Sequence, residues 1–252
     1  MPSNIAIVLV EPQGAGNIGS VCRAMLNFGT TDLRLVNPQV DHRGFEARKM
    51  AVKGADLLDQ ARVYPTLAEA LADCCLSFGT TRRFGRYREG LLHPDEAARQ
   101  LCDIDATDTC ALVFGREDKG LFTSELDLCQ HFITIPTDSR LPSMNLSQAV
   151  LVCLYELHKI AGEMAGQTHG RKKLASNDRL EDLYRHMRDS LLHIGYLNPQ
   201  NPDHILRCYR RIFGRAGLND REVRVLRGMF NQIDIICGRK SARGSGAEDP
   251  GA

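Results

Sequence analysis

The sequence has no tryptophan, contains 6% aromatic residues, and has no apolar run near the roughly 18 residues that a membrane-spanning helix needs. Its first residues, MPSNIAIVLVEP, lack a basic leader and a small-residue cleavage site. These absences predict a cytoplasmic protein with no membrane segment.

Spacings typical of metal ligands are also missing. The nine cysteines never occur as C-x-x-C, and the eight histidines never occur as H-x-x-x-H. The cysteines are odd in number and scattered, which favours reduced, buried thiols over a disulfide framework. We therefore expect no metal site.

The net charge of +1 conceals an asymmetry along the chain. Residues 1–170 carry 16 Lys and Arg against 21 Asp and Glu, whereas residues 171–240 carry 15 against 8, a net charge of +7. A basic C-terminal part on a mildly acidic body predicts a polyanionic partner for that part. The alternative is an ordinary solvated charged face.

The 252 residues, 43% of them hydrophobic, suffice for one full domain and a smaller one. Short apolar runs alternate with amphipathic segments, which predicts an α/β fold with a mostly parallel sheet and helices on both faces. The expected strands are residues 4–10, 32–36, 75–79, 110–114 and 132–135. The expected helices are residues 17–28, 44–59, 66–73, 94–102 and 145–164.

The chain after this domain reads as a small all-α extension. Leu180, Leu183, Met187, Leu191 and Ile194 recur at helical spacing, and two further helical stretches follow. The predicted division is a first domain over 1–165, a linker over 166–178, a basic helical extension over 179–240 and a disordered tail over 241–252.

Gly14, Gly16 and Gly19 spell GxGxxG after the first predicted strand, where a dinucleotide-binding loop lies. A nicotinamide site also needs an acidic residue after the second strand, and Asn37 stands there instead. An NAD(P)-dependent oxidoreductase therefore stays an alternative, although the sequence lacks the acidic residue that such an enzyme needs at this position. Asn17, Ser20 and Arg23 follow the glycines, and their polar groups suit a phosphate or ribose better.

Two later stretches, LVFGREDKGL (112–121) and IPTDSRLPSMNLSQAV (135–150), are also loops at predicted strand ends, where open α/β sheets bind ligands. The three loops in this order resemble the three motifs of the SpoU-type RNA 2′-O-methyltransferases of the SPOUT superfamily. The matching residues are Asn17, Gly19, Ser20 and Arg23; Gly115, Glu117, Gly120 and Leu121; and Ser143, Asn145 and Leu146.

That resemblance implies a C-terminal trefoil knot, although true knots are rare in proteins. It also implies a homodimer that uses S-adenosyl-L-methionine to methylate a ribose 2′-hydroxyl. With the basic extension, it points to tRNA as the partner and to cytidine or uridine at position 32, the first nucleotide of the anticodon loop. A SpoU-type enzyme acting on rRNA and a non-catalytic RNA-binding protein are the alternatives.

The resemblance assigns roles to individual residues. The expected catalytic group is Arg23, Asn17, Ser143, Asn145 and Glu117. The expected cofactor-binding residues are Thr80, Thr81, Gly115, Ile135, Ser143, Met144, Asn145 and Leu146. Because a guanidinium has a pKa above about 12, we expect Arg23 to hold a phosphate and stabilise developing charge rather than act as the base.

RNA contacts are predicted mainly in TTRRFGRYREG (80–90), where arginines are interleaved with two aromatic residues. Guanidinium and ring planes hold phosphates and stack on unpaired bases. The expected RNA-binding residues are Ser20, Arg82, Arg83, Arg86 and Arg88.

Overall fold

The computed structural model describes residues 4–82, 90–165 and 172–238. It contains one sheet of six strands, all paired in parallel, in the order β3-β2-β1-β5-β4-β6. The strands are β1 (Ile5–Val10), β2 (Asp32–Val36), β3 (Arg62–Tyr64), β4 (Cys74–Thr80), β5 (Thr109–Phe114) and β6 (His131–Ile133). The predicted parallel sheet is confirmed.

The central strand β1 shows why this sheet needs two covering layers. All six of its residues are buried, and successive side chains of a strand point to opposite faces. One face carries Ile5, Ile7 and Leu9 into the larger core, and the other carries Ala6, Val8 and Val10 into the smaller one. An unbroken apolar run is what a parallel strand buried on both sides requires.

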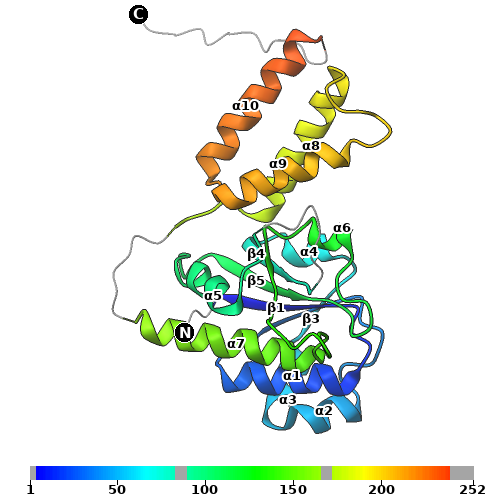
Figure 1. Cartoon of the computed structure of the whole chain (residues 1–252), viewed down its shortest axis with the longest axis vertical. Helices are drawn as coiled ribbons and strands as arrows, with labels where there is room; N and C mark the ends of the chain where they lie inside the picture. The colour runs from blue at the N-terminus through cyan, green and yellow to red at the C-terminus, as the bar shows by residue number, and fades with distance from the viewer. Residues whose placement is uncertain (1–3, 83–89, 166–171, 239–252) are drawn as a thin grey trace, which may run out of the picture.

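Helices cover both faces, as Figure 1 shows. The larger core is closed by α1 (Ala15–Asn27), α2 (Phe45–Ala51), α3 (Ala55–Gln60), α5 (Pro94–Cys102) and α7 (Leu146–Glu163). The smaller core is closed by the short helices α4 (Leu67–Leu71) and α6 (Thr123–Leu126).

The single helix predicted over 44–59 is wrong, because the chain breaks into α2, a 3-10 turn and α3. Val52 has a positive φ of 52°, which ends α2. The break brings Gly54 against α1, where a Cβ would lie 2.8 Å from the Cys22 carbonyl oxygen. Gly19 is tighter still, since its Cβ would lie 2.0 Å from the Ala47 carbonyl oxygen. These contacts allow α1 and α2 to pack closely.

The strand order separates this fold from a dinucleotide-binding domain. The classic order in that domain is 3-2-1-4-5-6, whereas β5 lies between β1 and β4 here. Asn37, which occupies the place of the missing carboxylate, lies 3.4 Å from Glu11 and has a φ of 44°. The oxidoreductase alternative therefore fails on topology as well as on sequence.

The C-terminal extension is helical, as predicted. It consists of α8 (Asn177–His193), α9 (Asp203–Ala216) and α10 (Asp220–Ile236), which share a separate apolar core. Four members of the predicted stripe are buried, but Ile194 is 44% exposed because α8 has already ended.

The boundary of the predicted linker differs from the structure, because α8 begins at Asn177. Lys172 is also held on the first domain, where its N–H donates to the Asp103 carbonyl (2.9 Å). Residues 166–171 and the predicted tail at 241–252 lie outside the described residues.

Side-chain contacts dock the extension against the sheet edge at β6. Gln130 accepts hydrogen bonds from the backbone N–H and hydroxyl of Ser77 (2.7 and 2.6 Å) and donates to Asn177 (3.0 Å). Arg207 of α9 pairs with Asp127 at 2.7 Å. The edge strand is thereby covered rather than left open to pairing.

A buried polar cluster joins α8 to α10 within the extension. Asp234 is 1% exposed, lies 3.0 Å from His186 Nε2 and accepts a hydrogen bond from the Ser190 hydroxyl (2.7 Å). We expect Asp234→Ala to lower the free energy of unfolding by about 1–3 kcal/mol, because it leaves buried polar partners unpaired. Urea unfolding measures this, with Gln232→Ala on the exposed side of α10 as the control. Equal midpoints for the two variants would contradict the prediction.

All nine cysteines are free thiols, and six of them are buried. Burial is the main cause that raises the pKa of Cys22 and of Cys129 to about 12, so these thiols stay protonated and inert at neutral pH. Cys208 and Cys237 are exposed, contrary to the expectation of buried thiols.

The trefoil knot stays a prediction.

Candidate active site

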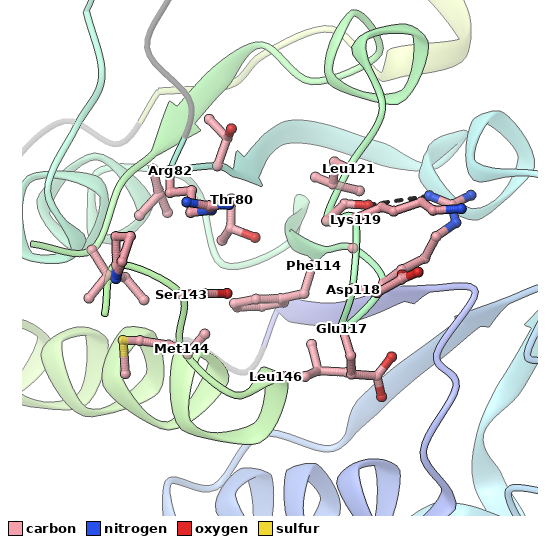
Figure 2. Close-up of a pocket in the computed structure, with 18 of the residues that line it drawn as sticks. Thr80, Arg82, Phe114, Glu117, Asp118, Lys119, Leu121, Ser143, Met144 and Leu146 are labelled. Carbon is pink, nitrogen blue, oxygen red and sulfur yellow. Dashed lines mark hydrogen bonds between the residues drawn. The ribbon is translucent and has the colours of Figure 1, made fainter. Parts of the chain in front are cut away.

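A cavity lies at the carboxyl ends of β4, β5 and β6, where parallel sheets bind ligands. It has a volume of about 140 Å³ and is partly open to solvent. Figure 2 shows Thr80, Phe114, Ser143 and Met144 around this cavity, drawn from three separate segments of the chain.

The turn after β5 forms one wall and leaves no room for a side chain at its first residue. A Cβ on Gly115 would lie 2.1 Å from the Gly120 carbonyl carbon and 2.3 Å from the Leu121 nitrogen. The turn closes through the Gly120 N–H, which donates to the Arg116 carbonyl at 2.9 Å, and Gly120 has a φ of 65°. Both glycines are therefore required by the backbone geometry.

Arg116 fixes this turn from beneath and is 7% exposed. Its guanidinium donates to Glu11 (2.7 Å) and to both carboxylate oxygens of Glu125 (3.0 and 2.9 Å), and it lies over the Phe122 ring. The hydrogen bonds to Glu125 raise the pKa of Arg116, and Arg116 in turn lowers the pKa of Glu11. Arg116 thus holds the Gly115–Gly120 turn in place, and its guanidinium N–H groups are bound by partners within the protein.

The three sequence motifs meet through one hydrogen-bond network. The Glu117 carboxylate accepts from the backbone N–H groups of Gln13 and Gly14 (2.9 and 3.0 Å) and from the Asn17 amide (2.9 Å). The Asn145 amide donates to Asn17 Oδ1 at 2.9 Å. Glu117 therefore holds the start of α1, and Asn17 connects it to the start of α7.

Asn145 also begins α7. Its Oδ1 accepts from the backbone N–H of Ser147 (2.9 Å), so Asn145 is the N-cap of this helix. Its side chain is directed into this network, and it is the one predicted cofactor residue that does not line the cavity. The other seven line it: Thr80, Thr81, Gly115, Ile135, Ser143, Met144 and Leu146.

Arg23 does not reach the cavity of its own chain. It is exposed on α1, is absent from the cavity wall, and makes no hydrogen bond or ion pair with any described residue. The Ser20 hydroxyl donates to the Gly16 carbonyl at 2.8 Å within the same helix. Of the first motif, Asn17 is the side chain that the structure joins to the other two motifs.

Arg82 is exposed and lines the rim of the cavity. The predicted RNA-binding residues Arg83, Arg86 and Arg88 lie outside the described residues.

The structure adds residues that the motifs did not identify. Phe114 lines the cavity at the end of β5, and Thr137 and Pro142 line it from the loop before α7. Their signal in the sequence was position alone, since each lies within or beside a strand-end loop already singled out. Gln13 contributes a backbone N–H to the network, and a backbone group leaves no signature in residue type.

Searches for a metal site and for a membrane-spanning helix gave the following results. Within the described part of the chain, no group of three or more His, Cys, Asp or Glu residues is placed to hold a metal ion. None of the helices described there has the length and apolar character that crossing a bilayer demands.

The structure thus combines a parallel sheet, a cavity at its strand ends and an Asn–Glu–Asn network that joins the three motifs of the SpoU type. The family model for the SpoU rRNA Methylase family matches residues 4–155, so the chain belongs to the SpoU methylase family. A second model, for the C-terminal domain of the tRNA methyltransferase TrmJ, matches residues 178–247.

Individual relatives match nearly the whole chain. The tRNA (cytidine/uridine/adenosine-2′-O-)-methyltransferase TrmJ of Pseudomonas aeruginosa is 37% identical over 248 residues, which cover 94% of this chain and 96% of that protein. The tRNA (cytidine/uridine-2′-O-)-methyltransferase TrmJ of Klebsiella pneumoniae is 36% identical over 239 residues, with coverages of 93% and 98%.

A solved structure supports the same relationship. TrmJ from Z. mobilis ZM4 superposes with a TM-score of 0.77 at 34% identity and covers 91% of this chain and 98% of its own. The fold, including the helical extension, is therefore that of a TrmJ-like member of the family.

Proposed function

We propose that this chain is an S-adenosylmethionine-dependent tRNA 2′-O-methyltransferase that modifies cytidine or uridine at position 32 of the anticodon loop. The observation that carries the proposal is similarity over more than nine-tenths of the chain to TrmJ enzymes whose names state 2′-O-methylation of cytidine and uridine in tRNA. The cavity and the network of the three motifs supply a site suited to it.

The cavity fits the cofactor by its shape. The backbone of Gly120 and Leu121 fills the space beside the Gly115 Cα, so this tight turn requires glycine and lines the cavity with main-chain groups, which can hold an adenine. Gly115 and Ile135 offer such groups, and Thr80, Met144 and Leu146 provide the remaining surface. When bound, the cofactor supplies a methyl group already activated for transfer.

The protein then has to position the ribose hydroxyl and stabilise charge. A guanidinium is a poor base, so we assign Arg23 the role of holding the neighbouring phosphate and stabilising the oxygen as its proton leaves to solvent. Asn17, Asn145 and Glu117 keep the N-terminal turn of α1 in place beside the cavity. Ser143, exposed at the rim, orients the incoming nucleotide.

A homodimer accounts for the distance of Arg23 from its own cavity. The helices α1 and α7 together expose Leu26, Leu151 and Tyr155, each more than 40% accessible. These residues lie on adjacent helices, with Phe28 of α1 packed edge-on against Tyr155. We propose that a second copy covers this face by two-fold symmetry and that each Arg23 then serves the other chain's cavity.

Calorimetry on the purified protein tests the cofactor assignment. We expect S-adenosylmethionine and S-adenosylhomocysteine to bind with measurable heat and NADH to give none, because the sheet order and Asn37 do not form a nicotinamide site. Heat from NADH alone would contradict the assignment.

Mapping 2′-O-methyl groups on tRNA and rRNA from a deletion strain and its parent tests the substrate. The expected result is loss of methylation at tRNA position 32 with rRNA unchanged. Loss confined to rRNA would replace the proposal with the ribosomal alternative, and no loss anywhere would favour a non-catalytic RNA-binding protein.

A further inference from the structure

Glu11 follows β1 in a backbone conformation that its residue type disfavours. Its φ is 46°, in the left-handed region that glycine adopts freely and that is strained for most other residues. Asn37 follows β2 with a φ of 44°, but asparagine tolerates this region better than glutamate does. The Glu11 N–H donates to the Val36 carbonyl at 2.8 Å, so the residue is still fixed to the sheet. The backbone at position 11 favours glycine, and the reason for a glutamate there therefore lies in its side chain.

The Glu11 carboxylate connects loops that are far apart in the sequence. Its Oε2 accepts a hydrogen bond from Arg116 Nε at 2.7 Å, across 105 positions, and its Oε1 lies 3.4 Å from the amide nitrogen of Asn37. The hydrogen bond from Arg116 lowers the pKa of Glu11, so the carboxylate is ionised at neutral pH. Arg116 is 7% exposed, and a buried guanidinium that loses one of its carboxylates is left partly unpaired.

The same two loops are joined a second time in the opposite direction. Glu117 directly follows Arg116 and accepts from the backbone N–H groups of Gln13 and Gly14, which lie two and three positions after Glu11. Each loop thus contributes one carboxylate that binds the other loop. We call this arrangement the loop clasp; it consists of the contact of Glu11 with Arg116 and the contacts of Glu117 with Gln13 and Gly14.

Arg116 connects the loop clasp to the cavity wall. It lines the cavity, and its carbonyl accepts the hydrogen bond from the Gly120 N–H that closes the turn. Its second carboxylate partner, Glu125, is nine positions away in the same stretch of chain, so that pair does not fix the turn relative to β1. Glu11 is not one of the described residues that line the cavity. Any effect of Glu11 on the cavity therefore passes through Arg116.

We propose that Glu11 is a positioning residue for methyl transfer. Through Arg116 it holds the Gly115–Gly120 turn in the conformation in which the main chain of the turn receives the cofactor. This inference rests on the proposed function, which places S-adenosylmethionine in the cavity. Removing the Glu11 carboxylate changes the shape of the site but takes away none of the groups that line it.

Two variants of the full chain, Glu11→Gln and Glu11→Gly, test the proposal by calorimetry with S-adenosylhomocysteine. We expect both to bind it about 10- to 100-fold more weakly than wild type, because a charge-assisted hydrogen bond that shapes the site is lost. Glu163→Gln is the matched control. Glu163 is exposed near the end of α7 and lies 4.0 Å from Arg99 in an exposed pair, so the affinity of this variant should equal that of wild type.

The glycine variant separates positioning from a purely structural role. Glycine accepts a φ of 46° without strain, so a structural role predicts a higher urea midpoint than that of Glu11→Gln together with wild-type affinity. Positioning predicts weaker binding in the folded protein. At saturating cofactor, the kcat for tRNA methylation should also fall about 10- to 100-fold while the KM for tRNA stays unchanged. Wild-type affinity in folded Glu11→Gly overturns the inference.

A double-variant cycle tests whether Glu11 acts through Arg116. Adding Glu11→Gln to Arg116→Gln should weaken S-adenosylhomocysteine binding no further, because the group through which Glu11 acts is already gone. Losses that multiply in the double variant would show a separate route and overturn the inference. The cofactor measurement needs no RNA, so a wild-type protein that binds S-adenosylhomocysteine but does not methylate tRNA counts against the proposed function alone.

Discussion

Replacing Gly115 with alanine is expected to weaken the binding of S-adenosylhomocysteine by about 10- to 100-fold. The new Cβ would overlap the Gly120 carbonyl carbon at 2.1 Å, so the turn that lines the cavity must open. Overpacking of this kind costs about 1–3 kcal/mol, and each 1.4 kcal/mol corresponds to a factor of about ten in affinity. Calorimetry measures the change directly.

Gly162→Ala is the matched control. Gly162 lies near the end of α7, has no heavy atom within 4 Å of its Cβ position and has an ordinary helical φ. Alanine there adds the same methyl group and favours the helix by roughly 0.5–1 kcal/mol. Its cofactor affinity should equal that of wild type. Equal affinities for the two variants would show that the Gly115 turn does not form the cofactor site.

Mixing two inactive variants is expected to restore about a quarter of wild-type activity, by the symmetry of a two-fold dimer. The variants are Arg23→Ala and Gly115→Trp, which damage the two halves of the proposed shared site. In a mixed dimer one site receives both changes and the other receives neither. Random reassortment makes about half of the dimers mixed, and each of these contains one intact site of two.

The experiment requires unfolding and refolding an equal mixture and measuring the activity of that mixture, then recovering mixed dimers through two different tags to confirm that they formed. If Arg23 served the cavity of its own chain, every site in a mixed dimer would keep one change. Activity that stays at the level of the separate variants, with mixed dimers recovered, would reject the shared site. A protein that remains monomeric at assay concentration would reject it as well.

The sequence predicted the elements in which local and long-range signals agree. The α5 helix has Pro94 at its first turn and an amphipathic stripe, and its predicted bounds match the structure. The strand β3 was missed because it has three residues, with Val63 52% exposed, and shows no alternation. It forms because the edge of β2 offers a partner, with Arg34 opposite Arg62.

The candidate site was predictable as three loops but not as one network. Asn17 and Glu117 are 100 positions apart, and Asn17 and Asn145 are 128 apart. Sequence spacing predicts which residues share a helix face or a loop, but it does not predict contacts between residues that lie more than a hundred positions apart. Only the folded structure shows that these three side chains meet. The expectation that Ser20 and Arg23 share the direction of Asn17 came from helical periodicity. Periodicity places a residue on a side of a helix but does not say what that side meets.

The Gln130 side chain fixes the helical extension relative to the sheet. It links β4 to the first turn of α8, and it lies directly before β6, whose end reaches the cavity. Gly214 of α9 packs against its backbone, with a Cβ position 3.1 Å from the Gln130 carbonyl oxygen. These contacts hold the helical extension at a defined distance from the strand-end cavity. An RNA that binds both the extension and the cavity therefore has to span the distance between them with its backbone.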